Sequence, residues 1–221
     1  MASAAMRIPL AAKLYLLSCH DRSGKTRISS ARLELGLGGA LLLELARSGR
    51  VGLVDEHVVV VDSTPVGDPL LDHALAELSG DARPRDPDHW VRHLARHARA
   101  AVERRLVTSG LLRVDDHRVL GLFPVHHAHQ TDSTLEHELV ERMAETVVLG
   151  RPADPETAAL VSLAAAVGLQ RCLFPRSDRR AVLQRMEEIA DGEWVGRAVH
   201  HAIEAQDAAL GIEAGAGGAA P

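Results

Sequence analysis

Two closely spaced junctions between helix and strand constrain the fold of this chain most. The aliphatic run Ala40–Arg47 stops just before Gly49, and the short apolar run Val51–Val54 follows at once. Because a glycine often follows the last turn of a helix, this segment predicts a helix that leads directly into a strand. Residues 62–75 predict the reverse order, namely a strand end, a turn with proline and glycine, and a new helix. These patterns alone indicate a mostly helical domain.

The composition supports packed helices as the main architecture. Hydrophobic residues make up 46% of the 221 residues and aromatic residues only 2%, so the core must be built from small aliphatic side chains. Such side chains favour closely packed helices over aromatic-rich strands. The formal net charge of −5 disfavours a dedicated nucleic-acid binder. The two cysteines, Cys19 and Cys172, are expected to be reduced thiols of a cytoplasmic protein.

The chain is expected to form a single domain. We find no internal repeat and no long linker, so the domain is predicted to span residues 8–210, with a short tail at 1–7 and a disordered Gly/Ala-rich tail at 211–221. No signal peptide is recognised, and no stretch reaches the roughly 18 apolar residues of a spanning helix. Contact with a membrane would therefore be peripheral.

Apolar periodicity predicts helices along most of the chain, and two short hairpins interrupt them. The predicted helices are Pro9–Cys19, one from Ser29 or Ser30 to the Gly49 stop, Leu70–Leu78, Asp88–Ser109 with Asp88 as its cap, Ser133–Leu149, Asp154–Leu169, Ser177–Ala190 and Glu193–Leu210. The first hairpin is predicted from Val51–Val54 and Val58–Val61, and the second from Leu111–Val114 and Arg118–Phe123 around an Asp115–His117 tip. His126–Thr131 is expected to be irregular.

The second predicted helix carries glycines at positions 36, 38 and 39. A glycine inside a helix costs about 1 kcal/mol relative to alanine. The cluster therefore predicts either a break in the helix or a backbone that another element must approach closely.

One flank of the helix predicted at 88–109 is rich in arginine. Arg92, Arg96 and Arg99 fall within about 60° of one another on a helical projection, beside an apolar stripe. Arginine suits phosphate because its planar guanidinium group donates two parallel hydrogen bonds. Glu103 lies on the same flank and would partly neutralise it. From the residues alone, an exposed helix face with an Arg–Glu pair is the favoured interpretation.

Several of these segments resemble the Golgi phosphoprotein 3 family. The resemblance is strongest in Leu41–Arg50, Thr64–Leu75 and Leu106–Leu112 and extends from about Ile8 to Leu210. It implies the mainly helical fold of that family and a peripheral membrane protein that binds phosphatidylinositol 4-phosphate. The scarcity of lysine, present only at positions 13 and 25, suggests a GC-rich genome and hence a bacterial member.

The resemblance also implies which residues bind the lipid headgroup. Arg96-His-Ala-Arg99 stands where eukaryotic members carry an Arg-x-x-Arg pair that holds the inositol phosphate, and Arg92 is a weaker candidate. Two other pocket positions are substituted, because Ser29 stands where those members have tryptophan and Gly38 where they have arginine. Affinity and selectivity for the 4-phosphate are therefore expected to be reduced. Arg27 and Arg32 lie nearby in sequence and are candidates to compensate.

The second hairpin is the expected surface for self-association or for contact with the bilayer. In the family the matching hairpin mediates self-association and can enter the bilayer interface. The apolar residues of this hairpin here are Val119, Leu120, Leu122 and Phe123. The alternative is that these residues pack on the helical core. The expected partners are phosphoinositides or other anionic lipids, a membrane surface and further copies of the chain, with no nucleic acid. In eukaryotic relatives that membrane is the Golgi membrane.

No catalytic or cofactor-binding motif is recognised, and the protein is expected to be neither an enzyme nor a metal protein. His126, His127 and His129 are irregularly spaced, and His93 and His97 are one turn apart, which is weak evidence for a metal. The alternative function is a winged-helix DNA-binding regulator, because a helix precedes Gly110 and a hairpin. Its predicted wing, however, has the acidic tip Asp115-Asp116.

Overall fold

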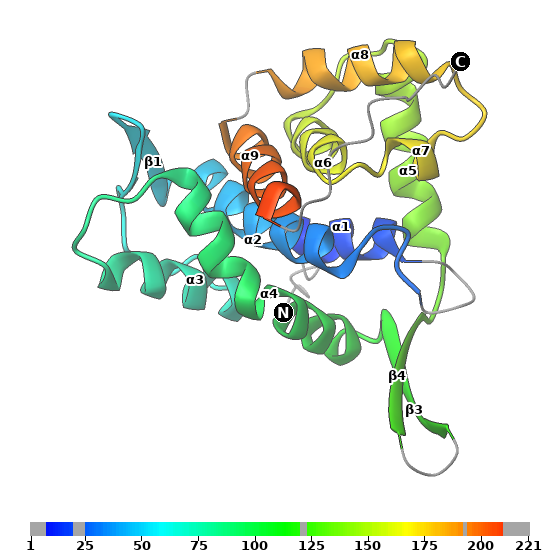
Figure 1. The fold of residues 1–221 in the computed structure, drawn as a ribbon, viewed down its shortest axis with the longest axis horizontal. Coiled ribbons are helices and arrows are strands. Elements are labelled where there is room, and N and C mark those ends of the chain that lie inside the picture. The colour runs from blue at the N-terminus through cyan, green and yellow to red at the C-terminus, as the bar shows by residue number, and fades with distance from the viewer. Residues whose placement is uncertain (1–7, 20–24, 120–122, 192–193, 210–221) are drawn as a thin grey trace, which may run out of the picture.

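The computed structural model describes residues 8–19, 25–119, 123–191 and 194–209, and between 114 and 129 it describes the backbone alone. The fold is mainly helical and carries two small antiparallel hairpins, as predicted (Figure 1). The helices of the described residues are α1 (Leu10–Ser18), α2 (Ser30–Arg47), α3 (Pro69–Gly80), α4 (Pro87–Thr108), α5 (Thr134–Val147), α6 (Pro155–Ala166), α7 (Gln170–Leu173), α8 (Arg179–Ala190) and α9 (Trp194–Ala209). The short α7 was not predicted. The expected tails at 1–7 and 211–221 lie outside the described residues.

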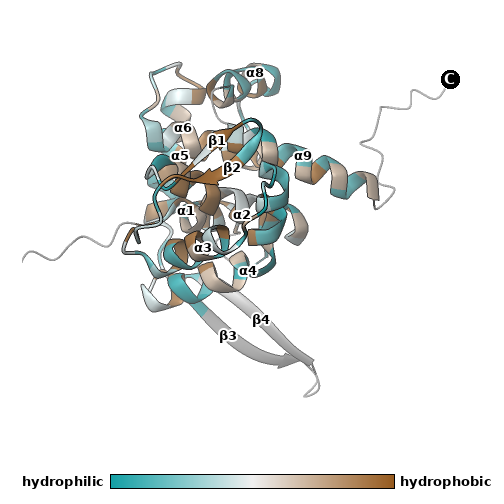
Figure 2. Ribbon diagram, turned by 90° about the vertical axis from the view of Figure 1, so that its left-hand side faces the viewer, coloured by the Kyte–Doolittle hydropathy of each residue, from teal (hydrophilic) through white to brown (hydrophobic). Residues whose placement is uncertain are grey.

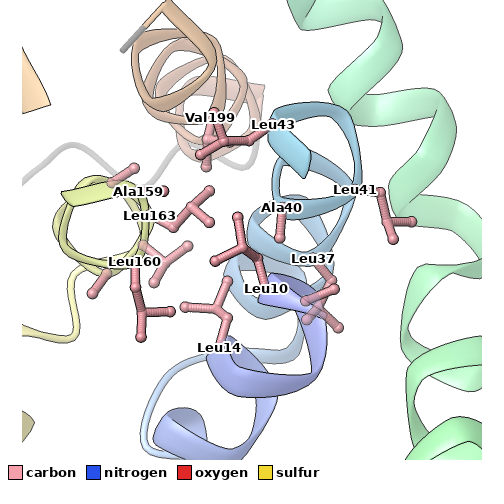
Figure 3. Close-up of a cluster of buried hydrophobic side chains, with 14 of the residues drawn as sticks. Leu10, Leu14, Leu37, Ala40, Leu41, Leu43, Ala159, Leu160, Leu163 and Val199 are labelled. Carbon is pink, nitrogen blue, oxygen red and sulfur yellow. The ribbon is translucent and has the colours of Figure 1, made fainter. Parts of the chain in front are cut away.

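Helix α1 lies at the centre of the molecule. All of its residues are buried, including Lys13, which forms an ion pair with Glu156 on α6. A helix that is apolar on every side is typical of a position enclosed by other helices. Figure 3 shows Leu10 and Leu14 of α1 meeting side chains from α2, α6 and α9 in one aliphatic cluster.

The glycines of α2 are points of close approach, so the second of the two predicted explanations holds. The helix is continuous, and a Cβ atom added at Gly36, Gly38 or Gly39 would lie within 2.5 Å of another element. The neighbours are Val167 Cγ1 for Gly36, the Val91 carbonyl oxygen of α4 for Gly38 and Val199 Cγ2 of α9 for Gly39. The missing side chains let three elements pack directly on the backbone of α2.

Of the two predicted helix caps, the one for α2 is confirmed and the one for α4 is wrong. Ser29 caps α2 by accepting a hydrogen bond from the Arg32 amide, and Asp154 and Asp178 cap α6 and α8 in the same way. The cap of α4 is Asp86, whose carboxylate accepts from His89 N at 2.6 Å, and not Asp88. Pro87 is the reason, because proline fits the first helical position and therefore moves the cap to the residue before it.

The first hairpin forms where predicted, but its second strand begins and ends one residue earlier than the predicted Val58–Val61. Strands β1 (Val51–Val54) and β2 (His57–Val60) pair antiparallel and are joined at Asp55 and Glu56, which both have positive φ. Two consecutive positive φ values are typical of the two-residue turns that match the twist of a hairpin. Figure 2 shows hydrophobic residues on these strands and an alternation of hydrophobic and hydrophilic residues along α9.

The second hairpin is longer than predicted, and its connection lies elsewhere. Strands β3 (Leu112–Val119) and β4 (Phe123–Gln130) pair over their whole length, from Leu112 with Gln130 to Val119 with Phe123. Asp115–His117 are therefore inside β3 and not at the tip, and the segment expected to be irregular forms most of β4. The local turn signal of two aspartates yields to antiparallel cross-strand pairing along a register of eight residue pairs. The hairpin extends away from the helices (Figure 1).

Candidate functional site

The arginine flank of α4 lies beside the start of α2. The apolar stripe of α4 is buried as predicted, and Arg92 and Arg96 are exposed on the neighbouring side of the helix. Helices α2 and α4 make the most extensive helix–helix contact of the molecule. This packing places the arginines next to the capped N-terminus of α2, whose backbone amides carry partial positive charge.

Arg99 is held in place by side chains from three helices. Its Nε donates to Glu103 Oε1 at 2.9 Å, and its Nη1 donates to Ser30 Oγ at 2.9 Å. The buried Tyr15 of α1 donates its hydroxyl to the same Glu103 oxygen at 2.8 Å. Helical periodicity predicted Glu103 as a neighbour of the arginines, but only the fold reveals the contributions of Tyr15 and Ser30.

The electrostatics of this cluster keep Arg99 charged. Burial alone would lower the pKa of the guanidinium group, but the hydrogen bond and the charge of Glu103 outweigh burial and raise it. Burial also raises the pKa of the Tyr15 hydroxyl, so Tyr15 remains a hydrogen-bond donor. The hydrogen bonds to Glu103 and Ser30 use Nε and Nη1 of Arg99. A cation fixed in this way is suited to an anionic ligand, because a guanidinium group has further N–H donors.

Arg92 and Arg96 differ from Arg99 in their partners. Within the described part of the chain, neither forms a salt bridge. Together with Arg99 they form a row along α4, with one helical turn between neighbours. The row therefore combines two exposed cations and one anchored cation, which is a suitable arrangement for a ligand that carries phosphate.

The two substituted pocket positions have structural roles in this chain. Ser29 is exposed and caps α2. Gly38 is buried where α2 crosses α4, and a Cβ there would lie 2.4 Å from the Val91 oxygen and 2.7 Å from the Ala95 nitrogen. An arginine at position 38 would require α4 to move, so the substitution to glycine is coupled to the helix packing.

Arg27 and Arg32, the candidates for compensation, are engaged elsewhere. Arg27 donates to Glu136 of α5 at 2.7 Å and to the Cys19 carbonyl, and its side chain is largely buried. Arg32 forms a salt bridge with Asp207 of α9 at 2.6 Å. Both arginines join helices, and a compensating role in headgroup binding would require them to leave these partners.

The predicted hairpin residues are only partly described. Val119 and Phe123 pair at the outer end of the β3–β4 ladder, and Leu120 and Leu122 lie outside the described residues. The inner end is fixed by Gln130, which donates to the Leu16 carbonyl at 2.9 Å and to Glu136 at 2.8 Å.

No group of three or more potential metal ligands occurs among residues whose side chains are described. The side chains of His126, His127 and His129 are not among them. His93, which the sequence pairs with His97, instead contacts Glu77 of α3 at 3.2 Å.

These observations define a mainly helical protein with two β-hairpins and an arginine-bearing helix beside a capped helix N-terminus. The chain belongs to the Golgi phosphoprotein 3 (GPP34) family, whose model matches residues 10–206.

A similar protein is vacuolar protein sorting-associated protein 74 of Eremothecium gossypii, which is 25% identical over 132 residues. This match covers 49% of the chain and 40% of the fungal protein, so it spans about two fifths of that relative. No helix in the described residues has both the length and the apolar character needed to cross a bilayer.

Proposed function

We propose that this protein is a peripheral membrane adaptor without catalytic activity that binds the anionic headgroup of a phosphoinositide through Arg96 and Arg99. The observation that carries the proposal is the anchored Arg99, held by Glu103 and Ser30 beside the start of α2. The exposed Arg96 lies one turn earlier on the same side of α4. A phosphate between the two guanidinium groups accepts hydrogen bonds from both.

Binding to an isolated headgroup is expected to be weak. Each charge-assisted hydrogen bond contributes about 1.5–3 kcal/mol when shielded from water and less at an open surface. Ser29 and Gly38 supply neither the aromatic side chain nor the cation that eukaryotic members have at these positions. Membrane attachment therefore depends on avidity between copies of the chain and on apolar contact by the β3–β4 hairpin. On this proposal the protein is cytoplasmic and binds the membrane surface reversibly.

The double substitution Arg96→Ala/Arg99→Ala tests the headgroup site. We expect it to reduce binding to vesicles that contain phosphatidylinositol 4-phosphate by at least about tenfold, because two charged contacts are removed. Wild-type binding should also fall as salt rises. Vesicle sedimentation over a panel of phosphoinositides and other anionic lipids measures both effects and identifies the preferred lipid.

Arg179→Ala/Arg180→Ala is the matched control, because it removes the same charge from two exposed residues of α8. Equal losses in the two double variants would indicate attraction by net charge alone. Unchanged binding in Arg96→Ala/Arg99→Ala, with the helical circular dichroism preserved, would contradict the headgroup site. Salt-dependent binding to duplex DNA in place of vesicles would favour a winged-helix regulator instead.

Self-association through the β3–β4 hairpin is the second part of the proposal. A paired strand that extends from the helices presents a backbone edge to another copy. Replacing residues 115–127 by an Asn-Gly turn keeps the inner pairs from Leu112 to Val114 and removes the outer ones. We expect light scattering to detect an oligomer for the wild type and a smaller species for this variant. A strict wild-type monomer at high concentration would contradict this part of the proposal.

A further inference from the structure

A second feature adjoins the arginine row, namely a groove between α2, α4 and α9. Its volume is about 440 Å³, and it is lined mainly by small apolar side chains. Five of the lining residues are alanines: Ala31, Ala95, Ala202, Ala205 and Ala209. Because alanines cannot fill the space between three helices, an apolar hollow remains at the surface.

The groove also has charged side chains. Arg92 and Arg96 line it from α4, and Glu34 lines it from α2. Arg92 and Arg96 form no salt bridge within the described residues, so the lining carries an excess of positive charge. Arg96 thus belongs both to the proposed headgroup site and to the groove.

The chemistry of this surface changes along α4. Arg99 and Arg96 can hold a headgroup phosphate, and Arg92 lies one turn further along the helix, beside the apolar alanines. A phosphoinositide also changes from charged to apolar along its length. Its ring phosphate comes first, the inositol ring separates it from the phosphodiester, and the glycerol and acyl chains follow. A single helical turn, about 5.4 Å, separates successive arginines of the row.

We infer that Arg92 and Arg96 bind the phosphodiester of the lipid and that the alanine-lined groove takes the glycerol and the first carbons of an acyl chain. The inference rests on the proposed function and extends it from the headgroup to the apolar part of the same lipid. The occupant is a phospholipid because the groove combines an apolar floor with cations at one side. In this arrangement the apolar contact, and not the headgroup alone, anchors the lipid.

The test compares two soluble probes by titration calorimetry: inositol 1,4-bisphosphate and phosphatidylinositol 4-phosphate with two six-carbon chains. Burial of two methylene groups is enough for about a tenfold change in affinity, so the wild type should bind the chain-bearing probe at least about tenfold more tightly. Ala205→Trp fills the groove from α9 without touching the core, because Ala205 is exposed. This variant should lose the preference for the chain and bind the headgroup like the wild type.

Ala208→Trp is the matched control, since Ala208 is also exposed on α9 but does not line the groove. It should keep the wild-type preference. Equal affinity of the wild type for the two probes, or a preference that survives in Ala205→Trp, would overturn the inference while leaving the headgroup site intact. Failure of the wild type to bind either probe would instead overturn the proposed phosphoinositide function, and the groove inference with it.

Discussion

Replacement of Gly38 by alanine is expected to lower the free energy of unfolding by about 3 kcal/mol, and replacement by arginine to lower it further. The added Cβ would lie 2.4 Å from the Val91 carbonyl oxygen, a backbone atom that cannot rotate away as a side chain can. Helix α4 would have to separate from α2, which disturbs the most extensive helix contact of the molecule. Urea denaturation followed by circular dichroism measures the change.

Gly80→Ala is the control, because an added Cβ there meets no atom within 4 Å and the residue also lies in a helix. Its effect should remain within about 0.5 kcal/mol, or stabilise slightly. We also expect Gly38→Arg not to strengthen vesicle binding, although it restores the residue of the eukaryotic family. A stable Gly38→Arg protein with tighter lipid binding would show that α4 can move away and that position 38 reaches the headgroup.

Glu136→Ala is expected to destabilise the protein by about 3–5 kcal/mol, because it removes a buried carboxylate that forms a salt bridge with the largely buried Arg27. Glu136 is only 4% exposed and accepts hydrogen bonds from Arg27 and from Gln130 at the inner end of β4. The same substitution removes one of the two acceptors of the Gln130 amide. Thermal unfolding and urea denaturation should both report the loss.

Glu138→Ala provides the comparison, since Glu138 lies on the same helix but is exposed. Its loss should change stability by no more than about 0.5 kcal/mol. Hydrogen exchange at the backbone amides of residues 112–119 adds a local readout, and these amides should exchange faster in Glu136→Ala. Equal stability of the two variants would mean that Arg27 finds another carboxylate or reaches water.

The hairpin illustrates what the sequence could not determine about the site. Asp115 and Asp116 are typical turn residues, and local propensity therefore placed the tip there. Strand pairing depends on which two segments meet, and the register of Leu112 with Gln130 makes these aspartates strand residues. Val119 and Phe123, two of the residues proposed for self-association, pair at the outer end of the ladder.

The arginine row illustrates the opposite case. Helical periodicity alone placed Arg92, Arg96 and Arg99 on one side of α4 and the apolar stripe on another, and the structure agrees because α4 is a regular helix. Periodicity could not identify the neighbours of that side. Ser30 lies 69 residues from Arg99 and Tyr15 lies 88 residues from Glu103 in the sequence, so these contacts depend on how α1, α2 and α4 pack.

The sequence by itself determined all helices but the short α7, the cap of α2 and the glycines of α2 as points of interest, because periodicity, capping and backbone freedom are local properties. Only the tertiary structure decided that Gly38 faces the backbone of α4, that Arg27 and Arg32 join helices, and that alanines of α2, α4 and α9 leave a groove beside Arg92 and Arg96. These features depend on distances between residues far apart in the chain. Such distances are set when the helices bury their aliphatic faces against one another.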